Sequence, residues 1–147
     1  MFKHLLVPTD GTDFSMAAVQ RAVSFASDAG ARVTFLHAEH PFPAMYCGEG
    51  AIMDESAPAF FHEQADRQAH QILGAAEEIA RRAGVECTAL ALISESPYEA
   101  IVEAAELNGC DLIFMASHGR TGIGHLLLSS ETEKVLRHTK IPVLVHR

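Results

Sequence analysis

Short apolar runs alternate along the chain with longer segments in which apolar residues recur at helical spacing. Polar or turn-forming residues bound the runs, whose length is typical of buried strands. We therefore predict five strands, at residues 2–7, 33–38, 85–93, 112–115 and 141–145. The segments between them predict four helices, over residues 12–30 and 59–84, from 97 to 108, and from 129–130 onward.

Strict alternation of strands and helices is typical of the α/β fold class. Strands joined by helical crossovers form a parallel sheet with helices on both faces, and right-handed crossovers make the fold doubly wound. A chain of 147 residues is long enough for one such domain with a substantial core. Periodicity alone leaves the order of the strands open.

Local signals refine the element boundaries. Gly30 is placed to end the first helix, and the run Ser96-Pro97-Tyr98-Glu99 has the pattern of a capping box with proline in the first turn. An apolar stripe on the second helix predicts a face packed on the sheet, made of Phe61, Ala65, Ile72, Ala76, Ile79 and Ala83. Residues 40–58 are rich in proline and glycine, and we predict an irregular surface excursion there.

Composition narrows the range of functions. A net charge of −8 disfavours broad binding to nucleic acid, which needs a basic face. No apolar stretch approaches the length of a membrane span, and the early Lys3, His4 and Asp10 are unlike a secretory signal, so we expect a cytoplasmic protein. Three cysteines without a Cys-x-x-Cys pair disfavour a disulfide framework and a zinc site.

The C-terminal third carries the most specific pattern. The predicted strand 112–115 runs into the turn Ser117-His118-Gly119, a glycine-containing loop follows, and Ser129-Ser130 opens a helix. This order places free backbone N–H groups and the positive end of a helix dipole at one point, which favours a bound phosphate. The alternative is a helix that is only well capped, with Ser130 as the cap and Glu133 three residues on.

Both ends of the chain resemble the universal stress protein family. That family has Gly-x-x-Gly at the end of its fourth strand and, nine residues later, Gly-Ser/Thr at a helix start; Ala116, Gly119, Ser129 and Ser130 occupy these positions. Residues 5–18 and 131–145 also resemble the family's first strand and its ending. The resemblance implies a Rossmann-like, adenine nucleotide alpha hydrolase-like sheet of order 3-2-1-4-5.

The resemblance also implies a ligand, ATP with or without Mg²⁺, bound where strands one and four end side by side. Open α/β sheets bind ligands in such a crevice. Asp10 would contact the sugar or base, the backbone of Ala38 the base, and Gly119, Ser129 and Ser130 the phosphates. The complete set of expected nucleotide-binding residues is Pro8, Thr9, Asp10, Ala38, Met115, Ala116, His118, Gly119, Arg120, Ser129, Ser130 and Glu131.

Several of these residues have alternatives. Asp10 and Asp13 are also suited to cap the first helix. The carboxylate of Glu131 interacts favourably with the positive end of the helix dipole but would repel a neighbouring phosphate. His118 and His125 would attract a phosphate when protonated. Because Ala116 and Ser129 replace glycines of the family pattern, a weakened or lost ATP site is the alternative to tight binding.

Catalytic and metal-binding signatures are absent from the sequence. It contains no Gly-x-Ser-x-Gly elbow, no Walker A motif and no kinase set. His62 and His70 stand eight residues apart on one predicted helix, too far for one metal ion. We therefore expect neither catalytic residues nor a metal site.

The last strand bears on assembly. Ile141, Val143 and Val145 alternate with Pro142 and Leu144, so both of its faces are apolar. In the implied order this strand lies at an edge, which invites pairing with another chain. The resemblance implies a homodimer through this strand; the alternative is that the last helix and the C-terminal end cover it.

Three functions remain open. The first is a dimeric nucleotide-binding stress sensor without dedicated catalysis. The second is a family member that has lost nucleotide binding and works as a protein-interaction module, with a partner that the sequence does not name. The third is a nucleotide hydrolase, for which no catalytic base is recognisable.

Overall fold

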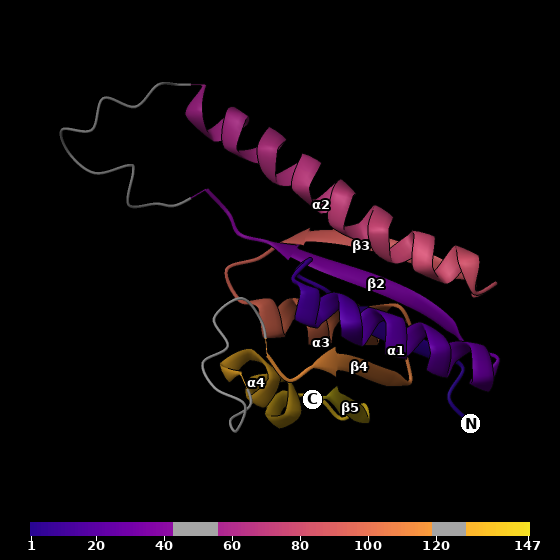
Figure 1. The fold of residues 1–147 in the computed structure, drawn as a ribbon. Helices are drawn as coiled ribbons and strands as arrows, with labels where there is room; N and C mark the ends of the chain where they lie inside the picture. The colour runs from indigo at the N-terminus through magenta and orange to yellow at the C-terminus, as the bar shows by residue number, and fades with distance from the viewer. Residues whose placement is uncertain (43–55, 119–128) are drawn as a thin grey trace.

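The computed structural model describes residues 1–42, 56–118 and 129–147. In this part of the chain, strands and helices alternate as the hydrophobic pattern predicts (Figure 1). The elements are β1 (His4–Pro8), α1 (Asp13–Ala29), β2 (Arg32–Glu39), α2 (Ala57–Arg82), β3 (Cys87–Ile93), α3 (Pro97–Leu107), β4 (Leu112–Ala116), α4 (Ser130–His138) and β5 (Val143–His146). No helix within the described residues is both long and apolar enough to cross a membrane.

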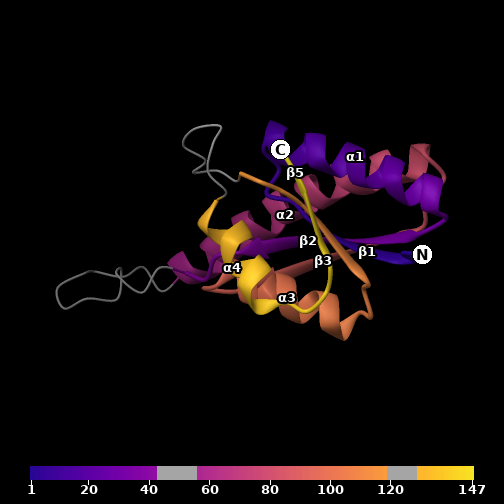
Figure 2. The same ribbon diagram turned by 90° about the horizontal axis from the view of Figure 1, so that it is seen from below.

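The strands form one parallel sheet in the order β3-β2-β1-β4-β5. Helices α1 and α2 cover one face, and α3 and α4 cover the other (Figure 2). The predicted doubly wound fold and its strand order 3-2-1-4-5 are therefore confirmed. The order makes β3 and β5 the edges and places β1, the first strand, at the centre.

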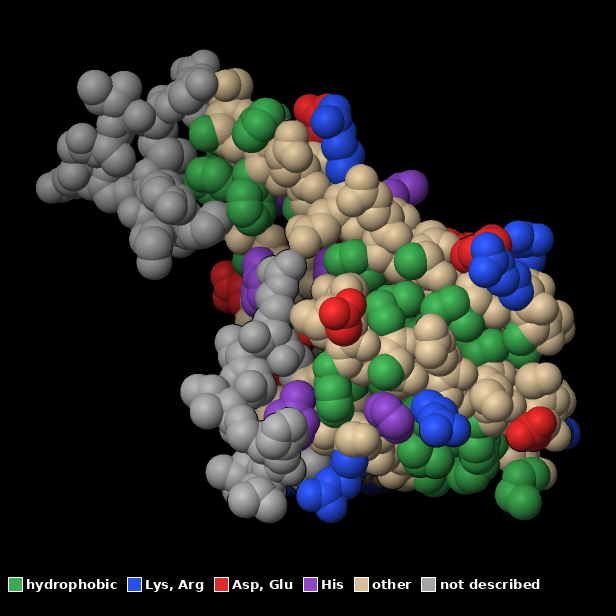
Figure 3. All heavy atoms as spheres, in the orientation of Figure 1, with side chains coloured by type: hydrophobic (Ala, Val, Ile, Leu, Met, Phe, Trp, Pro, Cys, Tyr) green, Lys and Arg blue, Asp and Glu red, His purple; other side chains and the backbone are tan. Residues whose placement is uncertain are grey.

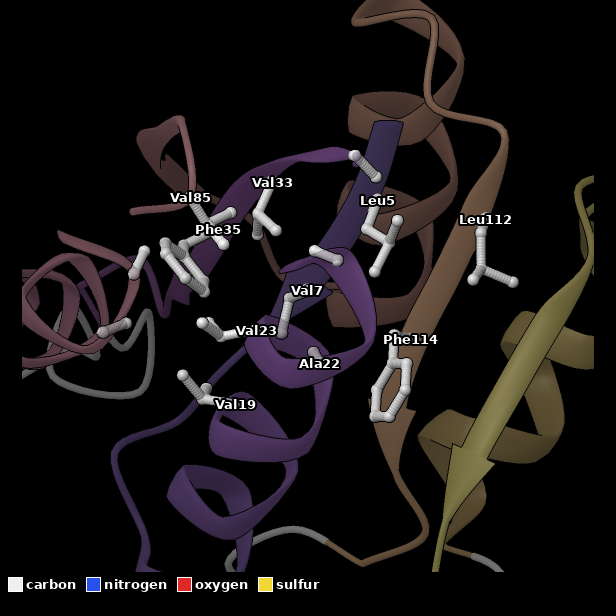
Figure 4. Packing of buried hydrophobic residues seen from close by; sticks show 14 of the residues in the cluster. Leu5, Val7, Val19, Ala22, Val23, Val33, Phe35, Val85, Leu112 and Phe114 are labelled. Atoms are coloured by element: carbon white, nitrogen blue, oxygen red, sulfur yellow. The ribbon is translucent and has the colours of Figure 1, made fainter. Parts of the chain in front are cut away.

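Side chains of the central strands alternate between the two faces, as the period of two requires. Leu5 and Val7 join the layer beneath α1 and α2, whereas Leu6 joins the layer beneath α3 and α4. On the first face, Val19 and Val23 of α1 lie against the sheet (Figure 4). All five side chains are at least 98% buried, and burial of an aliphatic side chain of this size stabilises a fold by about 1.5–3 kcal/mol.

The centre of the sheet divides toward its carboxyl edge. Strands β1 and β4 are paired only at Leu5↔Leu112 and Leu6↔Ile113. Beyond this point β1 continues to pair with β2 as far as Pro8↔Leu36. Strand β4 continues with β5 as far as Ala116↔His146. The carboxyl ends of β1 and β4 are therefore not paired with each other. These are the two strand ends that the sequence predicts to flank a crevice.

Helix ends agree only partly with the local signals. Gly30 ends α1 in the left-handed conformation, with φ 66°, as predicted. Ser129, and not Ser130, caps α4, because its side chain accepts a hydrogen bond from the N–H of Thr132. The capping box predicted at Ser96 is wrong, since the Ser96 side chain makes no cap hydrogen bond. The second helix begins at Ala57, inside the predicted excursion, of which residues 43–55 lie outside the described residues.

Helix α2 is longer than the face of the sheet that it covers. Its buried residues all lie from its midpoint onward: Ala69, Leu73, Ala76 and Ala80. The N-terminal half projects past the carboxyl edge of the sheet (Figure 1). Of the residues that we predicted on the core stripe, only Ala76 is buried. Phe61 and Ala65 are half-buried and line a cleft described below, Ile72 and Ile79 are also half-buried, and Ala83 is exposed.

Candidate functional site

A cleft of about 990 Å³ opens where β1 and β4 separate. Each expected nucleotide-binding residue that the structure describes lines it: Pro8, Thr9, Asp10, Ala38, Met115, Ala116, His118, Ser129, Ser130 and Glu131. Gly119 and Arg120, as well as His125, lie outside the described residues. Two loops far apart in the sequence thus meet at one cleft. That their residues contact a ligand stays a prediction.

The β1–α1 turn is held by its own side chains. The carboxylate oxygen Oδ1 of Asp10 accepts hydrogen bonds from the backbone N–H (3.0 Å) and the hydroxyl (2.6 Å) of Thr12. Thr12 in turn caps α1, since its hydroxyl accepts from the N–H of Ser15. The structure therefore gives the capping role to Thr12, whereas Asp13 is the first residue of α1. Asp10 contributes indirectly, by orienting the cap.

Thr9 and Ser15 form the buried side of the same turn. The Ser15 hydroxyl donates to the hydroxyl of Thr9 (2.8 Å) and accepts from the N–H of Asp10 (3.1 Å). The ring nitrogen Nδ1 of His37, on β2, lies 2.9 Å from the carbonyl oxygen of Thr9. Gly11 closes the turn with φ +80°, a conformation that side chains disfavour. The chain is tied to β2 and α1 here, so the turn is a rigid wall.

The β4–α4 junction is anchored by different atoms. The N–H of Ser129 donates to the carbonyl of Ser117 (2.8 Å), and the hydroxyl of Thr132 donates to the carbonyl of Ala116 (3.1 Å). These bonds seat the first turn of α4 against the end of β4. The N–H groups of Ser130 and Glu131 donate to no residue in the described ranges. These unused donors and the positive end of the helix dipole lie where the sequence predicts an anion-binding site; binding there stays a prediction.

Glu131 has a structural partner that the sequence did not indicate. Its Oε2 accepts a hydrogen bond from the N–H of Tyr98 in the first turn of α3 (2.8 Å). Its Oε1 lies 3.5 Å from the Nζ of Lys134. Glu131 thus accepts a hydrogen bond from the first turn of α3, the role that we predicted for the side chain of Ser96. A partner so far along the sequence cannot be recognised from a local capping pattern.

His118 lies between the two junctions. Its Nδ1 is 2.7 Å from the hydroxyl of the buried Ser117. Its ring also meets the ring of Phe14 edge-on, with centroids 5.3 Å apart, and Phe14 belongs to the first turn of α1. The histidine therefore links the end of β4 to α1 at the rim of the cleft.

The end of β2 adds a buried carboxyl group. Glu39 is 5% exposed, and its Oε1 has no hydrogen-bond donor among the described residues. Burial raises the pKa of Glu39, and the nearby carboxyl of Asp66 raises it further, although the imidazoles of His37 and His62 act in the opposite direction. Ala38, the preceding residue, lines the cleft as expected.

The sequence analysis missed one complete wall of the cleft. The projecting half of α2 contributes Phe61, Gln64, Ala65 and Gln68, and Glu95, Pro97 and Ile101 line the cleft from β3 to α3. The spacing of Gln64 and Gln68 on one helical face was a usable signal. Its meaning depended on how far α2 extends past the sheet, which the sequence does not indicate.

The charged side chains that line the described part of the cleft are all acidic. They are Asp10, Glu39, Glu95 and Glu131, and no lysine or arginine of the described residues lines it. Within these same ranges, no group of three His, Cys, Asp or Glu is placed to hold a metal ion. An anion in this cleft would therefore bind through backbone N–H groups and, when protonated, the lining histidines His37, His40 and His118, rather than through a lysine or arginine of the described ranges.

A doubly wound sheet with a cleft at its switch point places this chain among the open α/β proteins, a class in which ligands bind at such a cleft. The chain matches the model of the universal stress protein family over residues 1–147. It is 33% identical over 147 residues to the universal stress protein in the QAH/OAS sulfhydrylase 3′ region of Thermus aquaticus, with 100% of both chains covered. The chain belongs to the universal stress protein family.

Solved structures agree with this assignment. The structure of MJ0577, from Methanocaldococcus jannaschii, is similar with a TM-score of 0.75 and 29% identity, covering 99% of this chain and 95% of that chain. A universal stress protein in complex with cAMP is similar with a TM-score of 0.73 and 25% identity, covering 99% of this chain and 97% of that chain.

Proposed function

We propose that this protein binds ATP in the cleft between β1 and β4 and works as a cytoplasmic, homodimeric stress-response sensor without dedicated catalysis. The observation that carries the proposal is that the Asp10 turn and the free N–H groups of α4 line one cleft. The relative in complex with cAMP supports an adenine nucleotide as the ligand class.

The geometry suggests how the nucleotide would lie. Its phosphates would accept hydrogen bonds from the N–H groups of Ser130 and Glu131, at the positive end of the α4 dipole. Asp10 uses only Oδ1 in the turn, so Oδ2 is available for a sugar hydroxyl. Ser129 turns its hydroxyl to Thr132. Replacing Ser129 with glycine should therefore leave ATP affinity unchanged; tighter binding would mean that Ser129 crowds the phosphates.

The direct test of the proposal is to identify what the protein carries. Mass spectrometry of ligand released from freshly purified protein should detect ATP or ADP. Isothermal titration of ligand-free protein should then show saturable heat with ATP. Protein that carries no nucleotide and gives no heat at millimolar ATP would refute nucleotide binding.

The acidic lining makes a prediction about the bound form of ATP. Four carboxylates line the described cleft, and they would repel a free polyphosphate unless a divalent cation neutralised part of its charge. We expect Mg²⁺-ATP to bind more tightly than ATP in the presence of a chelator. The same titration carried out with and without Mg²⁺ measures this difference.

The same lining favours a second candidate function, a family member that works as a protein-interaction module without a nucleotide. This candidate predicts that the released-ligand and titration experiments are both negative. It also predicts that substitutions at Ser130 change no ligand affinity.

The homodimer is proposed through β5, which lies at the edge of the sheet and pairs only with β4 within the described residues. Val143 and Val145 on this strand are half-buried. Light scattering after size exclusion should give twice the mass of one chain. Changing Val145 to lysine should yield monomers, and a wild-type monomer at micromolar concentration would contradict the proposal.

A further inference from the structure

Few contacts hold the two halves of the sheet together, and they lie at its amino edge. Strand β1 pairs with β2 along its whole length, but with β4 at only two positions. Directly before these positions, the N–H of Asp111 donates to the carbonyl of His4 (2.9 Å). The carboxylate of Asp111 accepts from the N–H groups of Lys3 (2.9 Å) and His4 (3.0 Å). His4 and Asp111 therefore close the amino end of the β1–β4 pairing.

The imidazole of His4 is enclosed in the sheet beside this pairing, with only 8% of the residue exposed. Its Nε2 lies 2.7 Å from the hydroxyl of Thr34 on β2, which lies 3.0 Å from the hydroxyl of Thr88 on β3. Its Nδ1 is buried and has no hydrogen-bond partner in the described part of the chain. Figure 3 shows other histidine side chains at the surface of this face, but none of the described residues near the N-terminus labelled in Figure 1.

Only the neutral form of this imidazole suits its surroundings. A protonated ring donates from both nitrogens, and it would be a cation without water around it. Burial is the main cause that lowers the pKa of His4 from the usual 6.5, and the guanidinium of Arg32 on β2 acts in the same direction. The carboxylate of Asp111, the backbone of Asn108 at the end of α3, and the carboxylate of Glu86 before β3 oppose this shift without cancelling it.

Two further titratable groups of this region keep their charge in mildly acidic solution. Burial raises the pKa of the Cys110 thiol to about 11, so the thiol stays neutral. Burial acts to raise the pKa of Asp111 as well, but the hydrogen bonds from the N–H groups of His4 and Lys3 outweigh it and lower that pKa, so the carboxylate stays ionised. Protonation of His4 is therefore the change that mild acid makes here.

We infer that His4 makes the β1–β4 pairing sensitive to acid: proton uptake by its ring opens the amino end of this pairing and separates the two halves of the sheet there. Opening on the β4 side gives the ring water, and the longer β1–β2 pairing stays intact. Because the closed state binds this proton less tightly than the open state, the pairing is most stable above pH 6.5 and weakens as the pH falls toward the closed-state pKa. The inference goes beyond the proposed function and does not depend on nucleotide binding.

The test is amide hydrogen exchange of the wild type, followed by NMR between pH 7.5 and pH 5.5 and corrected for intrinsic exchange rates. Protection of the Asp111 N–H should fall below pH 6.5, by up to about tenfold for each pH unit, because opening takes up one proton. The N–H of Thr9, which donates to the carbonyl of Leu36 on β2, should keep its protection. Constant protection at Asp111, or an equal loss at Thr9, would overturn the inference.

His4→Gln removes the titrating group and retains an amide that can bond to the hydroxyl of Thr34. Protection of the Asp111 N–H should then be the same at both ends of the pH range. The matched control is His70→Gln on α2, where the histidine is exposed, and it should keep the pH dependence of the wild type. A dependence that survives in His4→Gln, or that disappears equally in His70→Gln, would contradict the role of His4.

The ring itself provides a measurement that needs no variant. The Cε1 proton of His4, followed by NMR in the wild type, should titrate with a midpoint below 6.5. The loss of protection at Asp111 should begin above that midpoint, since the open state takes up its proton first. A midpoint at or above 6.5 would mean that the closed state accepts the charge, and the inference would fail.

Discussion

The two strand-to-helix junctions of the cleft share the same helix-cap hydrogen bonds but present different groups to the cleft. At the β1–α1 turn, the side chains of Asp10, Thr12 and Ser15 take up the backbone N–H groups of the turn. At the β4–α4 junction, side chains fix the helix in place, yet the N–H groups of Ser130 and Glu131 stay unused by the described residues. The N–H groups of Asp13 and Phe14 at the start of α1 are likewise unused by the described residues, but these two residues do not line the cleft, whereas Ser130 and Glu131 do. The second junction is therefore the one that presents donors to an anion in the cleft.

The strongest test of the first junction is a change at Gly11. A Cβ atom at this position would lie 2.7 Å from Cγ1 of Ile72 on α2, and the φ of +80° strains any other residue. Gly11→Ala should therefore destabilise the protein by about 3 kcal/mol in urea unfolding, combining backbone strain with overpacking. Gly30→Ala is the control, because it has a similar φ and no atom within 4 Å, and it should cost only about 1 kcal/mol. Equal losses would mean that α2 does not press on the turn.

The second junction can be tested by deleting a single N–H group. Ser130→Pro places proline at the first position of α4, where helices tolerate it, and Ser129 already has the extended conformation (φ −61°, ψ 152°) that precedes a proline. The variant should fold normally and bind ATP about tenfold more weakly, because one charge-assisted hydrogen bond is lost. Calorimetry measures the affinity, and thermal unfolding measures the stability.

Asp13→Pro is the matched variant at the first junction. Asp13 is the first residue of α1, and Thr12 before it has φ −68° and ψ 157°. Removing this N–H should leave ATP affinity unchanged, since the proposed phosphate site is at α4. If the two proline variants weaken ATP equally, the contrast between the junctions is wrong.

The caps provide a third and smaller test. Ser129→Ala should cost about 1 kcal/mol of unfolding free energy, the usual value for a lost cap, and leave ATP affinity nearly unchanged. Thr12→Ala should cost about the same or slightly more, because the hydroxyl of Thr12 also holds Asp10. The released Asp10 should then weaken ATP binding. An affinity that falls with Ser129→Ala and not with Thr12→Ala would reverse the assigned roles.

The smallest expected effect concerns pH and the buried Glu39 at the end of β2. Burial raises the pKa of Glu39 above its ordinary value of 4.5, so the folded state holds this proton more tightly than the unfolded state does. The resulting stability is present below pH 4.5 and is lost as the pH rises through the folded-state pKa. Glutamine cannot ionise at this position. The free energy of unfolding of Glu39→Gln, measured relative to that of the wild type, should therefore be higher at pH 8 than at pH 4. Unfolding curves at the two pH values measure this, and a gain at pH 4 instead would contradict the raised pKa.

The fold could be predicted from the sequence because the hydrophobic period of each element identifies it as a strand or a helix, although several helix ends could not be predicted. The apolar runs and Gly30 are local signals, and the family resemblance supplied the strand order that periodicity leaves open. The two junctions were also predictable, since Asp10 and Ser129-Ser130 stand directly after strands or before helices.

The remaining features depend on contacts between elements. Glu131 caps α3 across a long stretch of sequence, and α2 runs past the sheet far enough to place Gln64 and Gln68 on the cleft. Glu39 ends a strand whose pattern gives no sign that its carboxyl is buried. Such features follow from how helices pack, which hydrophobic period alone does not determine.

The early end of the pairing between β1 and β4 has one further consequence. The two halves of the sheet, β3-β2-β1 and β4-β5, are paired near the amino ends of β1 and β4 and are separate near their carboxyl ends. A ligand that contacts the carboxyl ends of both β1 and β4 would connect the two halves of the sheet where they are not hydrogen-bonded to each other. A bound ligand would then make the sheet stiffer across the β1–β4 boundary, and this stiffening would extend to β5 at the edge. No helix would have to move.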